Sequence, residues 1–338
     1  MTRLLDLSSD STEVKKVTDD IRKRLVGQDD IVNGFGRLLE LSASGLAASG
    51  KPIGSMLILG PTGLGKTYSG ECLGYALYGG KTPNIVRVDC AEFQHSHEIA
   101  RLIGSPPGYL GHRETHPFFT NTKLATMAAQ SGQWPFGIIQ FDEIEKANDS
   151  LWNLLLGILD KATLTLGTNE VVNFEKTIIL MTSNVGSEDM QSAINGKLGF
   201  AGAKSANDEE IAAIGIAAAK KKFTPEFINR LDILVAGRTL TEAENMEVLN
   251  REIIALWREI FMSSLPVRFN VTDAAKDGLM KEGYDPKYNA RHIKRAVDKF
   301  VRMPLARAIS GQHVPDPTEE MIVVDYVDGK FVYGVEKA

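Results

Sequence analysis

Short apolar runs recur along the first two thirds of the chain, and stretches with helical spacing of apolar residues separate them. Such runs are typical of buried strands, and their alternation with helices favours a parallel sheet covered on both faces. The predicted strands are 55–59, 85–88, 136–141, 177–181 and 233–236. The pattern therefore predicts an α/β fold for this part of the chain.

Amphipathic helices are expected around the first of these strands. Val14, Val17 and Ile21 recur at helical spacing behind a Ser11 cap, and two further helices are expected over 33–48 and 68–78. The pattern changes near residue 238, where a different set of elements begins. This set comprises a long helix over 241–263, a strand over 267–271, helices over about 273–283 and 290–310, and two strands within 321–333.

These changes predict three parts of the chain. We expect a short N-terminal segment over 1–20, a large α/β domain over 21–237 and a smaller α+β domain over 238–338. The hydrophobic content of 43% and the charged content of 24% are those of ordinary globular proteins. They exclude a disordered chain, a collagen-like chain and a long coiled coil.

Charge and cysteine content indicate which classes of partner and which compartment to expect. The 38 Lys and Arg residues against 43 Asp and Glu residues give a net charge of -5, which provides no overall attraction to nucleic acid or to anionic membranes. Cys72 and Cys90 are expected to be free thiols in a reducing compartment. No apolar run reaches the roughly 18 residues of a membrane span, and no signal peptide is evident. We therefore expect a cytoplasmic protein with no membrane partner.

A phosphate-binding motif follows the first predicted strand directly. Residues 60–67 read GPTGLGKT, which matches the pattern G-x-x-x-x-G-K-[ST]. The glycines let backbone N–H groups surround phosphate oxygens, and the next helix points its N-terminus at the anion. Lys66 is expected to contact the β- and γ-phosphates, and the Thr67 hydroxyl to bind Mg²⁺. The predicted ATP-binding residues of this loop are Gly60, Pro61, Thr62, Gly63, Leu64, Gly65, Lys66 and Thr67.

Candidate catalytic residues follow two other strands. The strand over 136–141 runs into Asp142 and Glu143, of which Asp142 is expected to hold Mg²⁺ and Glu143 to polarise the attacking water. Adjacent strand residues face opposite ways, so this pair works only at a strand end. Gln140 is a polar residue inside this apolar strand, and no chemistry is predicted for it. Asn184 ends the next strand and either orients the water or serves a turn.

The order of these motifs resembles the AAA+ module of the Clp-type unfoldases, and most of all the second ATPase module of ClpB, ClpA and ClpC. The resemblance runs from about Ile21 to Gly334. It rests on the stretches 24–28 (RLVGQ), 52–55 (PIGS), 101–111 (RLIGSPPGYLG), 142–147 (DEIEKA), 181–184 (MTSN), 223–232 (FTPEFINRLD), 283–286 (GYDP) and 289–291 (NAR). It implies an AAA+ P-loop ATPase, with a parallel sheet flanked by helices and a small C-terminal α+β lid domain. Because nothing matches the relatives' N-terminal domain or first module, we expect a stand-alone single-module protein.

The resemblance also implies a homo-oligomeric ring, usually a hexamer, with ATP at each subunit interface. Arg230 matches the arginine finger that reaches into the neighbouring subunit's site. Without the resemblance, Arg230 reads as a member of a surface ion pair. Arg291 matches the second sensor of the lid domain, although Asn289 stands where the family usually has glycine. Leu25 and Val26 match the apolar wall around the adenine.

Substrate handling is implied by a pore-loop match. Gly108, Tyr109, Leu110 and Gly111 match the central pore loop, where an aromatic ring between glycines grips an extended polypeptide. The stretches 112–117 and 166–169 depart from the family pattern. Residues 197–200 (KLGF) lie where ClpP-binding relatives carry a docking loop. The resemblance therefore leaves open whether a peptidase or an adaptor is a further partner. The isolated pair of His95 and His97 is too small for a metal site.

The expected function is an ATP-hydrolysing ring motor that unfolds, threads or remodels protein substrates through a central pore. One alternative is an AAA+ ATPase that acts on nucleic acid, for which the basic run 220–222 is a weak indication. Another is a nucleotide-switched assembly or disassembly factor, against which Glu143 and Arg230 argue.

Overall fold

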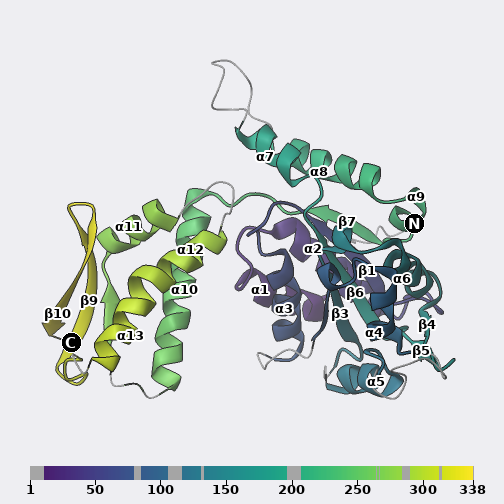
Figure 1. The fold of residues 1–338 in the computed structure, drawn as a ribbon, viewed down its shortest axis with the longest axis horizontal. Coiled ribbons are helices and arrows are strands. Elements are labelled where there is room, and N and C mark those ends of the chain that lie inside the picture. Colours follow the sequence, from purple (N-terminus) through teal and green to yellow (C-terminus); the bar gives the residue numbers. More distant parts are fainter. Residues whose placement is uncertain are drawn as a thin grey trace, which may run out of the picture. The chain divides into compact units, whose positions relative to one another are not determined.

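A computed structural model describes residues 11–79, 85–105, 116–130, 133–195, 207–263, 265, 267–283, 290–311 and 314–337. The chain divides into two compact units, and Figure 1 labels most of their helices and strands. The first unit is Met1–Pro61 with Gly65–Arg238, and the second is Thr239–Ala338 with Thr62–Leu64.

The first unit is built around a five-stranded parallel sheet with the order β2-β3-β6-β1-β7. Its strands are β1 (Gly54–Leu59), β2 (Ile85–Asp89), β3 (Gly137–Asp142), β6 (Thr177–Ser183) and β7 (Ile233–Ala236). The three central strands β1, β3 and β6 are buried along their whole length. The predicted parallel sheet is confirmed, with β3 one residue further along the chain than expected.

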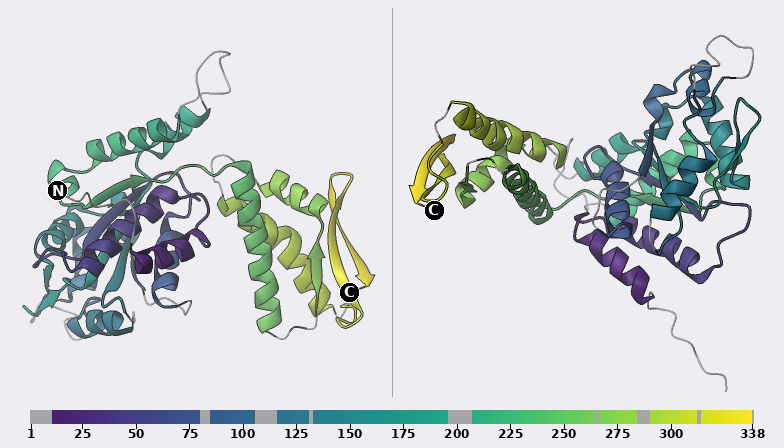
Figure 2. Two further views of the ribbon diagram at one scale, coloured as in Figure 1. Left: turned by 180° about the vertical axis from the view of Figure 1, so that it is seen from behind. Right: turned by 90° about the horizontal axis from the view of Figure 1, so that it is seen from below.

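Two apolar clusters cover the two faces of this sheet, because successive strand residues point to opposite sides. Leu57, Ile139 and Ile179 belong to one cluster, and Ile58, Ile138 and Ile178 to the other. Residues of α4 (Ala100–Ile103), α5 (Asn121–Gln130), α6 (Asp149–Lys161) and α8 (Asp208–Lys222) complete the first cluster, and residues of α1 (Thr12–Arg22), α2 (Asp29–Ser44) and α3 (Lys66–Leu77) complete the second. Helices α1 and α2, dark purple in Figure 2, pack side by side. Each large apolar side chain buried in this way contributes about 1.5–3 kcal/mol to folding.

Some boundaries in the first unit differ from the prediction. Helix α2 occupies 29–44 rather than 33–48, because Gly45 takes a left-handed conformation (φ 69°) that ends it. The strands β4 (Thr163–Thr165) and β5 (Val171–Asn173) form an antiparallel hairpin that was not predicted. Three residues per strand are too few for the period-two pattern to emerge. Within the described residues of this unit, the remaining α-helices are α7 (Ser187–Asn195) and α9 (Pro225–Ile228).

The second unit is a small α+β domain, as predicted. Its elements are α10 (Glu242–Met262), β8 (Phe269–Val271), α11 (Asp273–Gly283), α12 (Ala290–Val297), α13 (Met303–Ser310), β9 (Glu320–Val327) and β10 (Lys330–Lys337). The strands β9 and β10 form the expected hairpin, and β8 pairs with β9 in parallel. The single helix expected over 290–310 is wrong, since a π-helical turn over 298–302 separates α12 from α13. Pro304 has no N–H to donate to residue 300, which explains the break.

Candidate nucleotide site

The phosphate-binding motif forms a glycine-rich turn between β1 and α3. Gly60, Gly63 and Gly65 have φ angles of 137°, 87° and 84°, a region in which side chains are strained. Gly65 is the N-cap of α3, so the helix begins at Lys66 with its N-terminal N–H groups at the turn. This arrangement fits an anion such as the phosphates of ATP.

Lys66 lies inside this loop and is 8% exposed. Its Nζ donates to the carbonyl oxygens of Gly60 and Pro61, at 2.6 and 2.8 Å, and to Oδ1 of Asn184 at 2.9 Å. The ammonium group is therefore held between the loop and the end of β6. The side chain of Asn184 faces the site, and its carbonyl accepts from Ser187 N in a turn. The turn is therefore observed, and the orientation of a water by Asn184 stays a prediction.

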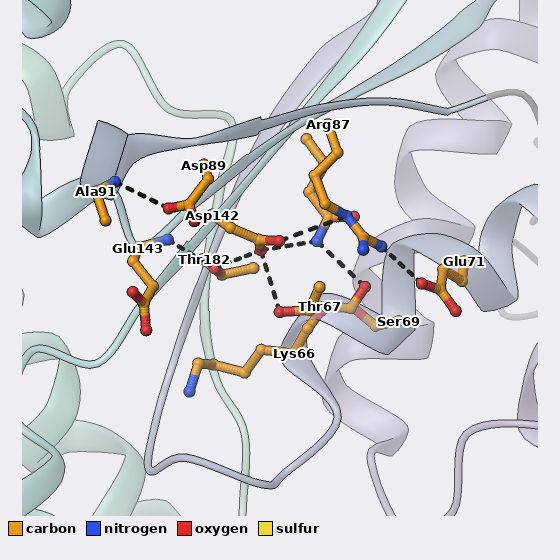
Figure 3. Close-up of polar contacts among 11 residues, drawn as sticks. Lys66, Thr67, Ser69, Glu71, Arg87, Asp89, Ala91, Asp142, Glu143 and Thr182 are labelled. Carbon is orange, nitrogen blue, oxygen red and sulfur yellow. Dashed lines mark hydrogen bonds and ion pairs between the residues drawn. The ribbon is translucent and has the colours of Figure 1, made fainter. Parts of the chain in front are cut away.

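Asp142 ends β3 next to the start of α3 (Figure 3). Its Oδ1 accepts three hydrogen bonds, from Thr67 Oγ1 (3.2 Å), Thr182 Oγ1 (2.8 Å) and Gln140 Nε2 (2.9 Å). Arg87 Nε lies 3.5 Å from Oδ2, and Arg87 also pairs with a glutamate of α3. The carboxylate is thus fixed from β3, β6, β2 and α3.

Glu143 follows Asp142 but points away from it (Figure 3). Its backbone is left-handed, with φ 56° and ψ 49°, and its N–H donates to Thr182 Oγ1 at 3.1 Å. Its carboxylate accepts from Lys146 Nζ and, at 3.1 Å, from Asn184 Nδ2. The hydrogen bond from Lys146 is the largest cause that holds the pKa of Glu143 below its ordinary value, against burial, which raises it.

The donor set at Thr67 and Asp142 fits Mg²⁺. The Thr67 hydroxyl and the Asp142 carboxylate meet at 3.2 Å, and such oxygen ligands are those that Mg²⁺ prefers. Among the described residues, no cluster of three His, Cys, Asp or Glu side chains forms a further metal site. His95 and His97 stack with ring centroids 5.7 Å apart.

Arg230 is not brought to the phosphate loop of its own chain. Its carbonyl accepts from Ser55 Oγ at 3.4 Å, near the start of β1, whereas the loop begins at Gly60, beyond the end of that strand. Five strand residues span about 16 Å. The guanidinium pairs instead with Glu226, at 2.8 Å, and with Asp160, at 3.7 Å. It therefore lies at the opposite edge of the sheet.

The other predicted residues are placed as follows. Leu25 and Val26 are buried, and Leu25 Cδ1 lies 3.1 Å from where a Cβ on Gly65 would stand, so this leucine packs on the loop. Arg291 lies exposed in the first turn of α12, in the second unit. The pore-loop residues 108–111 and the stretch 197–200 lie outside the described residues.

Four contributors to the site were not predicted: Arg87, Gln140, Lys146 and Thr182. The sequence points to Gln140 as a site residue, because this polar side chain interrupts an otherwise apolar strand. Thr182 stands beside Asn184 in a run of polar residues at a strand end, which is the same signal in weaker form. Arg87 and Lys146 look like ordinary charged residues, and only the sheet order brings Arg87 to Asp142.

Two family models match this chain, one in each unit. The family model for the AAA domain (Cdc48 subfamily) matches residues 51–234. The chain belongs to this family. The model for the C-terminal D2-small domain of ClpB protein matches residues 240–323, so the AAA+ module is of the Clp type.

Curated relatives are similar in sequence to this chain along nearly its whole length. The ATP-dependent Clp protease ATP-binding subunit ClpC of Staphylococcus epidermidis is 34% identical over 328 residues. The protein of the same name from Staphylococcus aureus is 34% identical over 329 residues. These matches cover 97% of this chain and 38% of the relatives. Within the described residues, no helix has both the length and the apolar character to cross a membrane.

Proposed function

We propose that this AAA+ module hydrolyses ATP, with Lys66, Thr67, Asp142, Glu143 and Asn184 as its active residues. The observation that carries the proposal is the continuous set of hydrogen bonds from Lys66 through Asn184 to Glu143, beside the Thr67–Asp142 pair. A cation that can bind phosphate, a general base and a pair of metal ligands therefore lie at one edge of the sheet. Phosphoryl transfer to water needs these groups together.

Each residue has a defined part in this proposal. Lys66 exchanges its carbonyl partners for phosphate oxygens, while the N–H groups at the start of α3 bind the same anion. Thr67 and Asp142 hold Mg²⁺, which when bound neutralises charge on the phosphates. Glu143 accepts a proton from the attacking water. Its pKa lies below the ordinary value of a glutamate, so the carboxylate is ionised at neutral pH as a general base must be. Asn184 fixes the carboxylate of Glu143 relative to Lys66.

A second copy of the chain supplies Arg230 in this proposal. The position of Arg230 at the far edge of the sheet supports a role in trans, because this edge lies away from the phosphate loop of its own chain. A guanidinium that approaches from a neighbour makes turnover dependent on assembly. Closed rings form from such head-to-tail contacts, and a hexamer is the assembly that we propose.

The proposed substrate is a polypeptide. The relatives are named ATP-binding subunits of a Clp protease, which supports a protein substrate here. We propose that Tyr109 contacts the chain being threaded, with apolar contact that tolerates many sequences. A peptidase or an adaptor as further partner stays a prediction.

The test compares Tyr109→Ala with Tyr109→Phe as matched control. ATP hydrolysis and the ATP-dependent loss of fluorescence of green fluorescent protein carrying an unstructured tail are measured in parallel. Tyr109→Ala is expected to hydrolyse ATP and to lose unfolding, and Tyr109→Phe to retain both. Unfolding by Tyr109→Ala at the wild-type rate contradicts the proposal. Stimulation of the ATPase by single-stranded DNA, with a steep salt dependence, favours a nucleic-acid substrate instead.

A further inference from the structure

Gln140 is a fully buried amide in the middle of β3. It shares a face of the strand with Ile138 and Asp142, and Ile138 belongs to the apolar cluster under α1, α2 and α3. An amide in such a place is unfavourable unless it is hydrogen-bonded. The hydrogen bonds of the Gln140 amide must therefore account for its place in the core.

The amide nitrogen of Gln140 joins two other parts of the site. Nε2 donates to Asp142 Oδ1 at 2.9 Å and to the carbonyl oxygen of Thr67 at 3.1 Å. A carboxylate and a carbonyl only accept hydrogen bonds, so these two contacts fix the amide with its nitrogen toward them. One side chain thus connects the two residues that the proposed function assigns to Mg²⁺.

The amide oxygen points to Gly70 in α3. A Cβ on residue 70 would stand 2.1 Å from Gln140 Oε1 and 3.1 Å from its Cδ, so the side chain fills the space that alanine would need. Among the described residues, Oε1 has no hydrogen-bond partner. Glycine inside a helix is unfavourable compared with alanine, and the close approach of Gln140 explains its presence here.

We propose that Gln140 is a positioning residue that holds the Asp142 carboxylate against the start of α3, and that Gly70 is the glycine this contact requires. The proposal rests on the proposed function, because it assigns Gln140 to the Mg²⁺-binding pair. Gln140 acts through Asp142 and Thr67 and does not itself contact nucleotide. Its removal is expected to weaken the Mg²⁺-dependent part of nucleotide binding.

The first test uses Gln140→Met, which keeps the length of the side chain and removes its donors. Calorimetry measures the affinity for the non-hydrolysable ATP analogue AMP-PNP with Mg²⁺ and with EDTA. We expect the gain in affinity from Mg²⁺ to fall about tenfold, as for other residues that orient metal ligands, and the affinity in EDTA to stay near wild type. An unchanged Mg²⁺ gain contradicts the proposal. Gln140→Leu repeats the test if the methionine variant does not fold.

The second test is a double-mutant cycle between the two residues. Gly70→Ala displaces the amide and is expected to reproduce the loss of the Mg²⁺ gain. In the Gln140→Leu background the oxygen is absent, so Gly70→Ala is expected to add little. Equal effects of Gly70→Ala in both backgrounds contradict the pairing.

Binding and turnover separate this inference from the proposed function. A wild-type protein that binds AMP-PNP with a large Mg²⁺ gain but never hydrolyses ATP contradicts the proposed ATPase and leaves the role of Gln140 measurable. Normal hydrolysis by the wild type with an unchanged Mg²⁺ gain in the Gln140 variants contradicts only the positioning role.

Discussion

The two edges of the parallel sheet hold candidate groups in different ways. At the edge where the parallel strands end, called here the carboxyl edge, Asn184 is hydrogen-bonded to both Lys66 and Glu143. Thr67 is hydrogen-bonded to Asp142 at the same edge. At the edge where the strands begin, called here the amino edge, Arg230 pairs with acidic side chains of its own chain. One edge therefore presents a connected site, whereas the other presents a cation whose proposed target lies outside the chain. In the function that we propose, a site built from both edges would be complete only where two copies meet.

The largest effect is expected at the amino edge. Arg230→Ala is expected to lower kcat for ATP by about 10³-fold or more, because an arginine finger stabilises charge that develops in phosphoryl transfer. Nucleotide binding should remain, since the carboxyl edge is untouched. Steady-state hydrolysis and AMP-PNP binding check both statements. Turnover near the wild-type rate contradicts the role given to Arg230.

A somewhat smaller effect is expected at the carboxyl edge. Glu143→Gln keeps the shape of the side chain and removes the base, so kcat is expected to fall about 10²–10⁴-fold while Mg²⁺-ATP still binds. Single-turnover hydrolysis measures the loss, and size measurement with ATP shows whether the assembly persists. Hydrolysis within a factor of about three of wild type would assign the base to another group.

A shift in pH dependence is expected next. Lys146 is the largest cause of the lowered pKa of Glu143, and burial acts in the other direction. In Lys146→Met the pKa of Glu143 therefore rises, less of the base is ionised in acid, and the acid limb of kcat moves to higher pH. Lys146→Arg is the matched control that keeps the cation. Profiles of kcat against pH that coincide for Lys146→Met and wild type contradict this coupling.

The smallest effect is expected for the partner of Arg230. Glu226→Gln removes an ion pair of 2.8 Å in which the glutamate is 64% exposed. Exposed pairs contribute little to stability, so the midpoint of thermal unfolding should barely change. ATP turnover is expected to be unchanged or slightly higher, because Arg230 is freer to reach a neighbour. A large loss of turnover would mean that Glu226 aligns Arg230 instead of restraining it.

The carboxyl edge could be predicted largely from sequence because its signals are local. Strand β1, the glycine turn and the cap of α3 follow one another in a single stretch. Asp142 and Glu143 end a strongly apolar strand, and the left-handed backbone of Glu143 supplies the turn that separates their side chains.

Other features depend on register and packing, which spacing does not reveal. Gln140 was visible as an anomaly, but its partners Thr67 and Gly70 lie on a helix some 70 residues earlier, and only the packing of α3 on β3 joins them. The hairpin of β4 and β5 was missed because each strand has three residues. Pro304 is visible in the sequence, but Val297, Val301 and Leu305 keep a spacing of four across the π-helical turn, so the apolar pattern predicts one helix over 290–310.

Mixing two inactive chains tests the composite site most directly. Glu143→Gln chains keep Arg230, and Arg230→Ala chains keep an intact carboxyl edge, so a mixed assembly contains interfaces with both groups. ATP turnover of the mixture is expected to rise by about tenfold or more over either variant alone. Turnover equal to the average of the two separate variants, in assemblies shown to contain both chains, contradicts a site completed by a neighbouring copy.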